Sequence, residues 1–334
     1  MQPNTARETA MAAWLDKELK GSAYSLAPAS SDASFRRYFR VAVDDNTYIV
    51  MDAPPEKEDC RPFIHVAGLM AAANLNVPEV LAQDLSQGFL LLSDLGSVTY
   101  LEALKGDKVH GLFLHALDAL VLWQCATRAD QLPHYDDALL RRELNLFPDW
   151  YVSKHVGMAL TDSQDQTLNS MFDLIIANNL AQPKVFVHRD YMPRNLMVSD
   201  PNPGILDFQD AVVGPISYDV ASLFRDAFIS WEEEQILDWT IRYWERARKA
   251  ALPVRNDFAD FYQDVEWMGL QRHLKVAGIF ARINYRDGKP HYLTDAPRFM
   301  GYIRHTCERY NNLRPLLKLL DVIEAKNTAV GYTF

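Results

Sequence analysis

One short stretch constrains the fold of this 334-residue chain more than any other part of its sequence. Residues 188–195 read HRDYMPRN, and a further carboxylate, Asp207, follows 17 residues after Asp190. Between them, the apolar runs 196–198 and 204–206 flank the turn-forming residues SDPNP, which is the pattern of a β-hairpin. Such a hairpin would return Asp207 to the mouth of the loop that carries Asp190.

The residue types in this pattern are those that transfer of a phosphoryl group from Mg·ATP to a hydroxyl requires. Asp190 would orient the hydroxyl and accept its proton, while Asn195 and Asp207 would hold the metal ions that bridge the phosphates. Two alternatives stay open. His188 and Asp190 could simply cap a turn, or the chain could be a pseudokinase that keeps the motif without turnover.

Composition allows a large core and argues against several classes of partner. Hydrophobic residues make up 49% of the chain, and its length suggests two domains or lobes. The net charge is −10 with no block of Lys or Arg, which disfavours nucleic acid and anionic membranes as partners. The three cysteines are scattered without a CxxC motif, so neither a disulfide framework nor a zinc site is indicated.

The first 22 residues are charged throughout and lack the apolar stretch of a signal peptide. No run reaches the roughly 18 apolar residues that span a bilayer. The first 22 residues predict instead a short amphipathic helix that ends at Gly21. An ATP-using enzyme of the cytoplasm fits these features and the reduced thiols.

The apolar periodicity predicts an α+β fold. Strand patterns at 38–43 and 47–51 flank a turn, a helix is expected over 58–74, and two more strands over 80–82 and 88–92. The remainder is predicted to be helical, interrupted only by the catalytic hairpin, over 107–128, 136–145, 163–179, 217–228, 232–250, 257–286 and 297–324. We therefore expect a small β-rich lobe, residues 1–93, and a large helical lobe, residues 94–334, with the catalytic loop at 188–195, a metal-binding segment at 207–210 and an acceptor site.

The whole chain resembles the protein-kinase-like fold, in its aminoglycoside phosphotransferase and choline-kinase branch. The resemblance implies that the small lobe binds ATP, that the segment LLLSDLG is a hinge, and that the helical lobe binds a small molecule. The backbone near Leu92, Asp94 and Leu95 would then bond adenine. His188 and Asp219 would support the catalytic loop, although Asp219 could also be an ordinary carboxylate in the first turn of a helix.

The chain departs from that pattern at the phosphate loop, because no GxGxxG motif is present. The matching residues, 30–37, read SSDASFRR. Small residues there still allow backbone N–H groups near phosphates, and an arginine could supply positive charge. The alternative for the arginines is a solvated strand edge. The expected nucleotide contacts are Ser31, Ala33, Ser34 and Arg36.

The strand over 48–51 also lacks the phosphate-binding lysine, and Met51 or Asp52 stands about where it would be. Taken alone, this departure favours a nucleotide-binding regulatory module without turnover. The intact set of Asp190, Asn195 and Asp207 argues against that interpretation.

A closer resemblance is carried by the segments SDASFRRYFRV, YIVMDAPPE, LLLSDLG, HRDYMPRNLMV and ILDFQDAVVGPISYDVASLFRD. Together they resemble the bacterial cell-wall amino-sugar kinases, which phosphorylate the anomeric C1 hydroxyl of N-acetylmuramate and N-acetylglucosamine in peptidoglycan recycling. Under this resemblance both departures are family traits, the cofactors are ATP and Mg²⁺, and a downstream uridylyltransferase consumes the sugar 1-phosphate. Residue spacing alone yields only a small-molecule kinase, which leaves aminoglycosides, choline and homoserine open as acceptors.

The acceptor site should lie near the catalytic loop on the helical lobe. N-acetylmuramate carries a carboxylate, so its site needs at least one cation, whereas choline needs an aromatic cage. Trp150 could stack on a sugar ring or belong to the core. For the basic stretch 272–275, the alternative is a polar helix face in water. The expected acceptor contacts are Arg194, Asp210, Glu143, Asn145 and His273.

Overall fold

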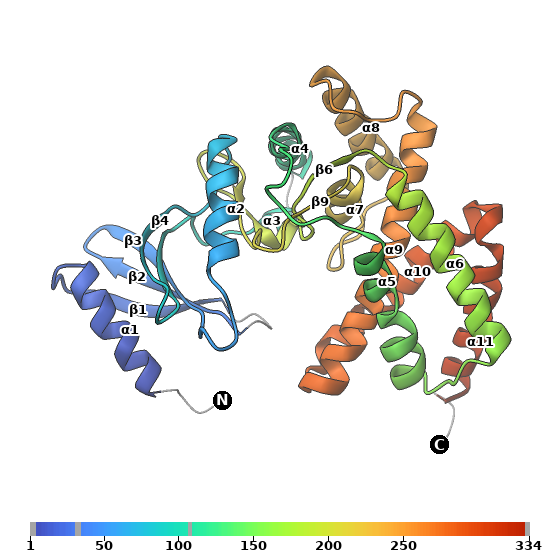
Figure 1. Ribbon diagram of the computed structural model, residues 1–334, viewed down its shortest axis with the longest axis horizontal. Coiled ribbons are helices and arrows are strands. Elements are labelled where there is room, and N and C mark those ends of the chain that lie inside the picture. The colour runs from blue at the N-terminus through green and yellow to red at the C-terminus, as the bar shows by residue number, and fades with distance from the viewer. Residues whose placement is uncertain (1–4, 31–34, 106–108, 331–334) are drawn as a thin grey trace. The chain divides into compact units, whose positions relative to one another are not determined.

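The computed structural model describes residues 5–30, 35–105 and 109–330 (Figure 1). Its Cα positions form two compact units. The first comprises Met1–Ala116 with Arg194–Asp210, and the second comprises Leu117–Pro193 with Ala211–Phe334. The functional division into lobes 1–93 and 94–334 stays a prediction.

The first unit is built on an antiparallel five-stranded sheet with strand order β1-β2-β3-β5-β4. The predicted hairpin over 38–51 is confirmed, because Val41 of β2 pairs with Tyr48 of β3. The strands are β1 (Ser25–Ser30), β2 (Arg37–Val43), β3 (Asn46–Asp52), β4 (Val80–Asp84) and β5 (Phe89–Ser93).

Two helices accompany this sheet. The predicted N-terminal helix is α1 (Thr5–Glu18), and its Trp14 packs on Phe89 of the sheet with ring centroids 5.7 Å apart. Helix α2 (Arg61–Ala72) is shorter than the predicted range 58–74. Asn74 has a φ of 59°, a left-handed conformation that cannot continue a helix.

The predicted catalytic hairpin is present and belongs to the first unit. Strand β7 (Leu196–Met197) pairs with β8 (Gly204–Ile205), directly after the 3₁₀ turn η2 (Pro193–Asn195). The Asn76 carbonyl accepts the N–H of Ile205 at 2.8 Å. The short helix α3 (Tyr100–Ala103) also packs on β7. The hairpin is therefore anchored to the unit that carries the sheet.

The second unit is largely helical and is organised around α9 (Phe258–Asp287), whose residues are mostly buried between Phe261 and Ala281. Within this unit α9 packs against α5, α6, α7, α8, α10 and the π-helix η1. Helix α4 (Val109–Cys125) begins in the first unit and continues into the second. The remaining helices are α5 (Asp137–Leu144), η1 (Phe147–His155), α6 (Asp162–Leu180), α7 (Tyr218–Phe224), α8 (Glu233–Lys249), η3 (Pro290–Asp295), α10 (Ala296–Arg309), η4 (Asn311–Leu313) and α11 (Arg314–Val330).

Two expectations for this region are wrong. The single helix predicted over 297–324 is two helices, α10 and α11, separated by η4 because Tyr310 has extended torsions. The catalytic hairpin is also not the only interruption, because β6 (Lys184–Val187) and β9 (Val212–Pro215) form a second small sheet. Each has four residues that are mostly buried, a run too short for periodicity to separate strand from helix.

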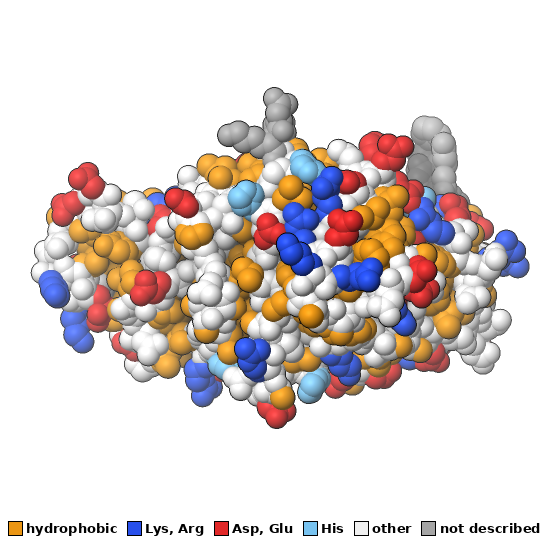
Figure 2. Space-filling view, turned by 90° about the horizontal axis from the view of Figure 1, so that it is seen from above, with side chains coloured by type: hydrophobic (Ala, Val, Ile, Leu, Met, Phe, Trp, Pro, Cys, Tyr) orange, Lys and Arg blue, Asp and Glu red, His pale blue; other side chains and the backbone are white. Residues whose placement is uncertain are grey.

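Acidic and basic side chains lie among one another on the face shown in Figure 2. Within the described residues, none of the helices combines the length and the apolar character that crossing a membrane would require.

Candidate active site

The catalytic loop begins where β6 ends. Residues 185–187 are buried in the small β6–β9 sheet, and His188 directly after them is fully buried as well. The N–H of Asp190 donates to Nδ1 of His188 at 3.2 Å, and the carbonyl of Asp190 accepts the N–H of Met192 at 2.9 Å. The turn of the loop is thus held by hydrogen bonds to its own backbone and to the imidazole. Asp190 itself is half-buried.

Asp219 holds the backbone of this loop. Its carboxylate accepts the N–H of His188 at 2.7 Å and the N–H of Arg189 at 3.1 Å. Complete burial raises the pKa of Asp219 to about 7, against the opposing effect of the two amides and of Arg272. The alternative of an ordinary first-turn carboxylate does not account for these two bonds, which are the geometry that supporting the loop requires.

Asn195 and Asp207 lie together in the first unit. Nδ2 of Asn195 is 3.4 Å from Oδ2 of Asp207, and the carbonyl of Asn195 accepts the N–H of Leu206 at 2.9 Å. Asp207 is exposed and has a φ of 62°. Asn195 carries an amide oxygen and Asp207 a carboxylate, the ligand types that Mg²⁺ prefers, so these residues fit the metal by their chemistry.

Sequence reasoning missed Gln209, whose Nε2 donates to Oδ1 of Asp207 at 2.8 Å. The neighbouring Phe208 is fully buried and packs on Phe63 of α2 with ring centroids 4.8 Å apart. This alternation of exposed acid and buried aromatic fixes the segment after the hairpin. Asp210 is exposed and Arg194 is half-buried.

The predicted phosphate contacts fall partly outside the described residues, which is the case for Ser31, Ala33 and Ser34. Nη2 of Arg36 lies 2.9 Å from Oε2 of Glu58, and only 13% of the arginine side chain is exposed. The alternative of a solvated strand edge is therefore wrong for Arg36.

Met51 and Asp52, which stand about where the lysine would be, are both buried on β3. Asp52 is the charged one of the two. Its carboxylate accepts a bond from Nε of Arg7 at 2.6 Å and from Nε of Arg37 at 2.9 Å. The alternative of a solvated strand edge is therefore wrong for Arg37 as well. Asp52 is therefore a carboxylate held by two arginines, opposite in charge to the lysine that is absent from this strand.

The predicted hinge follows β5. Leu92 is buried and pairs with Ile49 of β3. The carboxylate of Asp94 accepts a bond from Nε of Arg40 at 2.6 Å and from the N–H of Gly96 at 3.0 Å, and Leu95 is half-buried. The Asp94 side chain therefore fastens this turn, which leaves backbone groups as the means by which it could bind adenine.

The predicted acceptor contacts in the second unit are mostly engaged with other side chains. Glu143 is 5% exposed and lies against Arg189, Lys275, Tyr135 and Gln271. Asn145 is half-buried at the C-terminus of α5.

His273 is 2% exposed and stacks on Tyr302 with ring centroids 4.7 Å apart. Burial lowers the pKa of His273 to about 3, so its imidazole is neutral at pH 7. The alternative of a polar helix face in water is wrong for Arg272, His273 and Lys275, because all three are buried. Trp150 is half-buried on η1.

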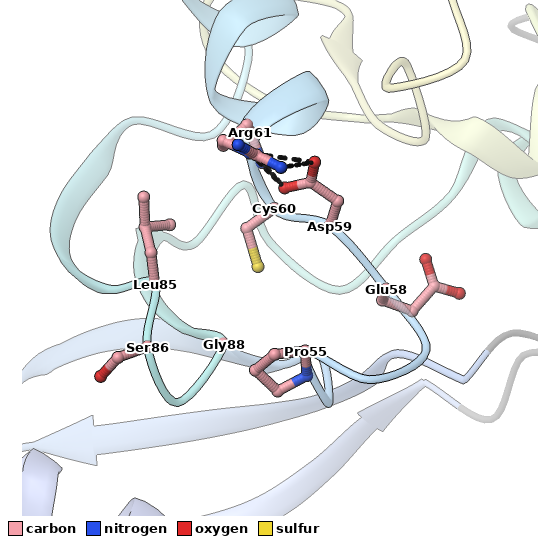
Figure 3. Close-up of a pocket in the computed structure, with 8 residues that line it drawn as sticks. All are labelled: Pro55, Glu58, Asp59, Cys60, Arg61, Leu85, Ser86 and Gly88. Atoms are coloured by element: carbon pink, nitrogen blue, oxygen red, sulfur yellow. Dashed lines mark hydrogen bonds and ion pairs between the residues drawn. The ribbon is translucent and has the colours of Figure 1, made fainter.

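A cavity of about 380 Å³ lies in the first unit, between the segment that precedes α2 and the turn between β4 and β5 (Figure 3). The thiol of Cys60 points toward the centre of the lining residues, and Arg61 pairs with Asp59 at its edge. The lining comprises Pro55, Glu58, Asp59, Cys60, Arg61, Leu85, Ser86 and Gly88. None of these residues belongs to the predicted site.

The sequence profile of the Phosphotransferase enzyme family matches residues 25–253. The chain belongs to this family. It is 55% identical over 295 residues to an N-acetylmuramate/N-acetylglucosamine kinase of Pseudomonas aeruginosa, covering 88% of this chain and 87% of that one. A protein of the same name from Pseudomonas putida is 49% identical over 335 residues, covering 97% and 99% of the two chains.

The solved structures include a choline/ethanolamine kinase family protein from Mesorhizobium loti, which matches with a TM-score of 0.64 at 13% identity. The match covers 94% of this chain and 99% of that one. The predicted α+β, protein-kinase-like fold and the predicted family are confirmed by these similarities. The protein is a phosphotransferase, which makes the regulatory module without turnover the weaker interpretation.

Proposed function

We propose that this protein is an ATP-dependent kinase that phosphorylates the C1 hydroxyl of N-acetylmuramate and N-acetylglucosamine. The observation that carries the proposal is the 49% identity to the Pseudomonas putida kinase across 97% of this chain. The presence of Asp190, Asn195 and Asp207 in the order that phosphoryl transfer requires supports it independently.

In the proposed mechanism Asp190 is the general base. It accepts a hydrogen bond from the C1 hydroxyl and takes the proton as the γ-phosphoryl group moves to the sugar oxygen. Its half-buried position at the turn held by His188 and Asp219 suits this role. Because phosphoryl transfer depends on alignment, a rigid loop contributes directly to the rate.

Asn195 and Asp207 are proposed to bind Mg²⁺, which neutralises charge on the ATP phosphates when it is bound. Gln209 orients the Asp207 carboxylate through its bond to Oδ1. Backbone groups of Leu92, Asp94 and Leu95 are proposed to bond the adenine ring.

On the phosphate side, we propose that Ser31, Ala33, Ser34 and Arg36 contact ATP. Asp52 of β3 is bound by Arg7 and Arg37, and we propose that it serves the fold of the first unit and does not contact the phosphates.

For the acceptor, Arg194, Asp210 and Asn145 remain the proposed contacts. We propose that the reaction takes place in the cytoplasm, where ATP is available, and that it belongs to peptidoglycan recycling. The product would be a sugar 1-phosphate, which a uridylyltransferase is expected to consume.

The test is ADP release with Mg·ATP and a panel of acceptors: N-acetylmuramate, N-acetylglucosamine, glucose, kanamycin, choline and homoserine. Turnover of the two N-acetylated sugars, with the phosphate located at C1 by ³¹P NMR, is expected. Turnover of kanamycin or choline alone would show that the acceptor is not an N-acetylated sugar, and the proposed catalytic residues would stand. ATP binding without turnover of any acceptor would instead favour the regulatory module.

A further inference from the structure

The residue directly before the proposed base has an unusual backbone conformation. Arg189 has a φ of 77°, in the left-handed region that residues with side chains rarely adopt. Because its torsions set the direction in which the chain enters Asp190, whatever holds Arg189 in this conformation also positions Asp190. Strained conformations of this kind persist only where the surroundings hold them.

Three groups hold Arg189, each at a different part of the residue. Asp219 accepts its N–H at 3.1 Å, and Nη1 of Arg272 donates to its carbonyl at 2.7 Å. Its own Nη2 donates to Oε1 of Glu143 at 2.7 Å. Asp219 comes from α7, Arg272 from α9 and Glu143 from α5, so three helices of the second unit fix one residue of the loop.

The Glu143 carboxylate has no capacity left for a ligand. Oε1 is bonded by Arg189 and, at 3.0 Å, by Nζ of Lys275. Oε2 accepts bonds from the hydroxyl of Tyr135 and, at 3.1 Å, from Nε2 of Gln271. A carboxylate offers about four acceptor positions, and four donors occupy them here.

Arg272 is equally well fixed. It is 7% exposed, and its guanidinium lies 4.8 Å from the centre of the Tyr218 ring. A buried arginine that donates to a backbone carbonyl and rests on an aromatic ring is held in a single orientation.

We propose that Glu143 and Arg272 are positioning residues, which act through Arg189 to hold Asp190 in its reactive orientation, and that Glu143 does not contact the sugar. This inference rests on the proposed function in taking Asp190 as the base. It replaces the expected acceptor contact at Glu143 with a role inside the protein.

The first test is Glu143→Gln, which keeps the shape and removes the charge. A displacement of the base by about 1 Å is expected to lower kcat about 100-fold. The KM for ATP and the Kd for the sugar, measured by calorimetry, should stay within about twofold of wild type, since neither ligand would touch Glu143. A sugar Kd that rises at least tenfold while kcat is unchanged would overturn the proposal.

Glu266→Gln is the matched control. Glu266 is a fully buried carboxylate of the same unit, and among the described residues its partners are Arg225, Arg309 and Tyr310. This variant should lose stability but keep kcat. A loss of kcat equal to that of Glu143→Gln would reduce the effect at Glu143 to general destabilisation and overturn the proposal.

A second pair of variants tests the backbone directly, because the two differ mainly in the backbone conformations that residue 189 can adopt. Arg189→Ala and Arg189→Gly both remove the bond to Glu143, but glycine adopts a positive φ without a penalty. The glycine variant is therefore expected to have a kcat at least about tenfold above that of the alanine variant. Equal kcat values for the two variants would show that the conformation of Arg189 does not position the base.

The kcat of every variant is measured with an acceptor that the wild-type protein phosphorylates. Failure of the wild type on both N-acetylated sugars would therefore count against the proposed function alone. The pattern among the variants still decides whether Glu143 and the conformation of Arg189 position the base.

Discussion

Individual carboxylates of the second unit differ in what surrounds them, and this separates their roles. Glu143 is bonded by four donors, and Asp219 by two backbone amides. Asp190 carries the same functional group but is only half-buried. A group that must exchange a proton with substrate has to be accessible to it, whereas carboxylates that organise the loop do not.

Asp190→Asn is expected to lower kcat by about 1000-fold, because an amide cannot accept the hydroxyl proton. The affinity for Mg·ATP should be nearly unchanged, since the proposed nucleotide contacts lie elsewhere in the chain. Single-turnover kinetics and nucleotide titration measure the two quantities. Normal turnover by this variant would exclude Asp190 as the base.

Glu143 should make the stability of the protein depend on acid pH. Burial acts to raise the pKa of Glu143, but Lys275 and Arg189 outweigh it and lower the pKa to about 2. Because this lies below the unfolded value of about 4.3, the stabilisation is complete above that pH and is lost as the pH falls toward 2.

Urea unfolding of wild type and Glu143→Gln at pH 7, 5 and 3 measures this effect. At pH 7 the variant is expected to be less stable by about 3–5 kcal/mol, the cost of leaving buried cations without their carboxylate. The difference between the two proteins should shrink at pH 3. A difference that is constant across this range would contradict the assigned pKa.

At the scale of elements, the close packing of α9 against η1 depends on Gly278. A Cβ placed at Gly278 would lie 2.3 Å from the backbone carbonyl carbon of Leu146, and a backbone atom cannot move aside as the end of a side chain can. The long central helix therefore lies against its neighbour with no side chain between them at this point.

Gly278→Ala should destabilise the protein by about 1–3 kcal/mol or more, because the two backbones must separate. Gly301→Ala in α10 is the control, since nothing lies within 4 Å of the added Cβ. That change should be neutral or stabilise by up to about 1 kcal/mol through helix propensity. Thermal unfolding compares the two, and equal melting temperatures would contradict the close approach.

For the molecule as a whole, the chain forms two compact units and passes between them after Ala116, after Pro193 and after Asp210. Nucleotide binding to the folded protein should raise its overall stability, by about 2.7 kcal/mol at a ligand concentration 100 times Kd.

Asp207→Asn is expected to lose most of the increase in Tm that Mg·ATP produces, because the charge that binds the metal is gone. The increase produced by ATP with EDTA should be the same in both proteins. Asp190→Asn should keep the full Mg·ATP effect. An unchanged Mg·ATP effect in Asp207→Asn would remove that residue from the metal site.

Patterns that are local in the chain allowed much of the fold to be predicted. The β2–β3 hairpin, the catalytic hairpin and helices such as α6 and α9 follow from apolar periodicity and turn residues over a few positions. The order of Asp190, Asn195 and Asp207 likewise lies within 18 residues. The missed strands β6 and β9 carry no such signal, because short buried runs look alike in either state. The break between α10 and α11 does carry one, since Asn311 and Asn312 are followed by Pro315 at the start of α11.

Local sequence patterns could not predict the network of contacts around Arg189. Glu143 is 46 residues from Arg189 and 128 residues from Gln271, so only the packing of α5 against α9 and against the catalytic loop brings them together. Burial then decides the electrostatics: it left His273 neutral, and it placed Glu143 among two cations that keep it ionised. Chemical identity and order are written along the chain, but the distances and desolvation that assign each charged group its role arise only when distant segments pack together.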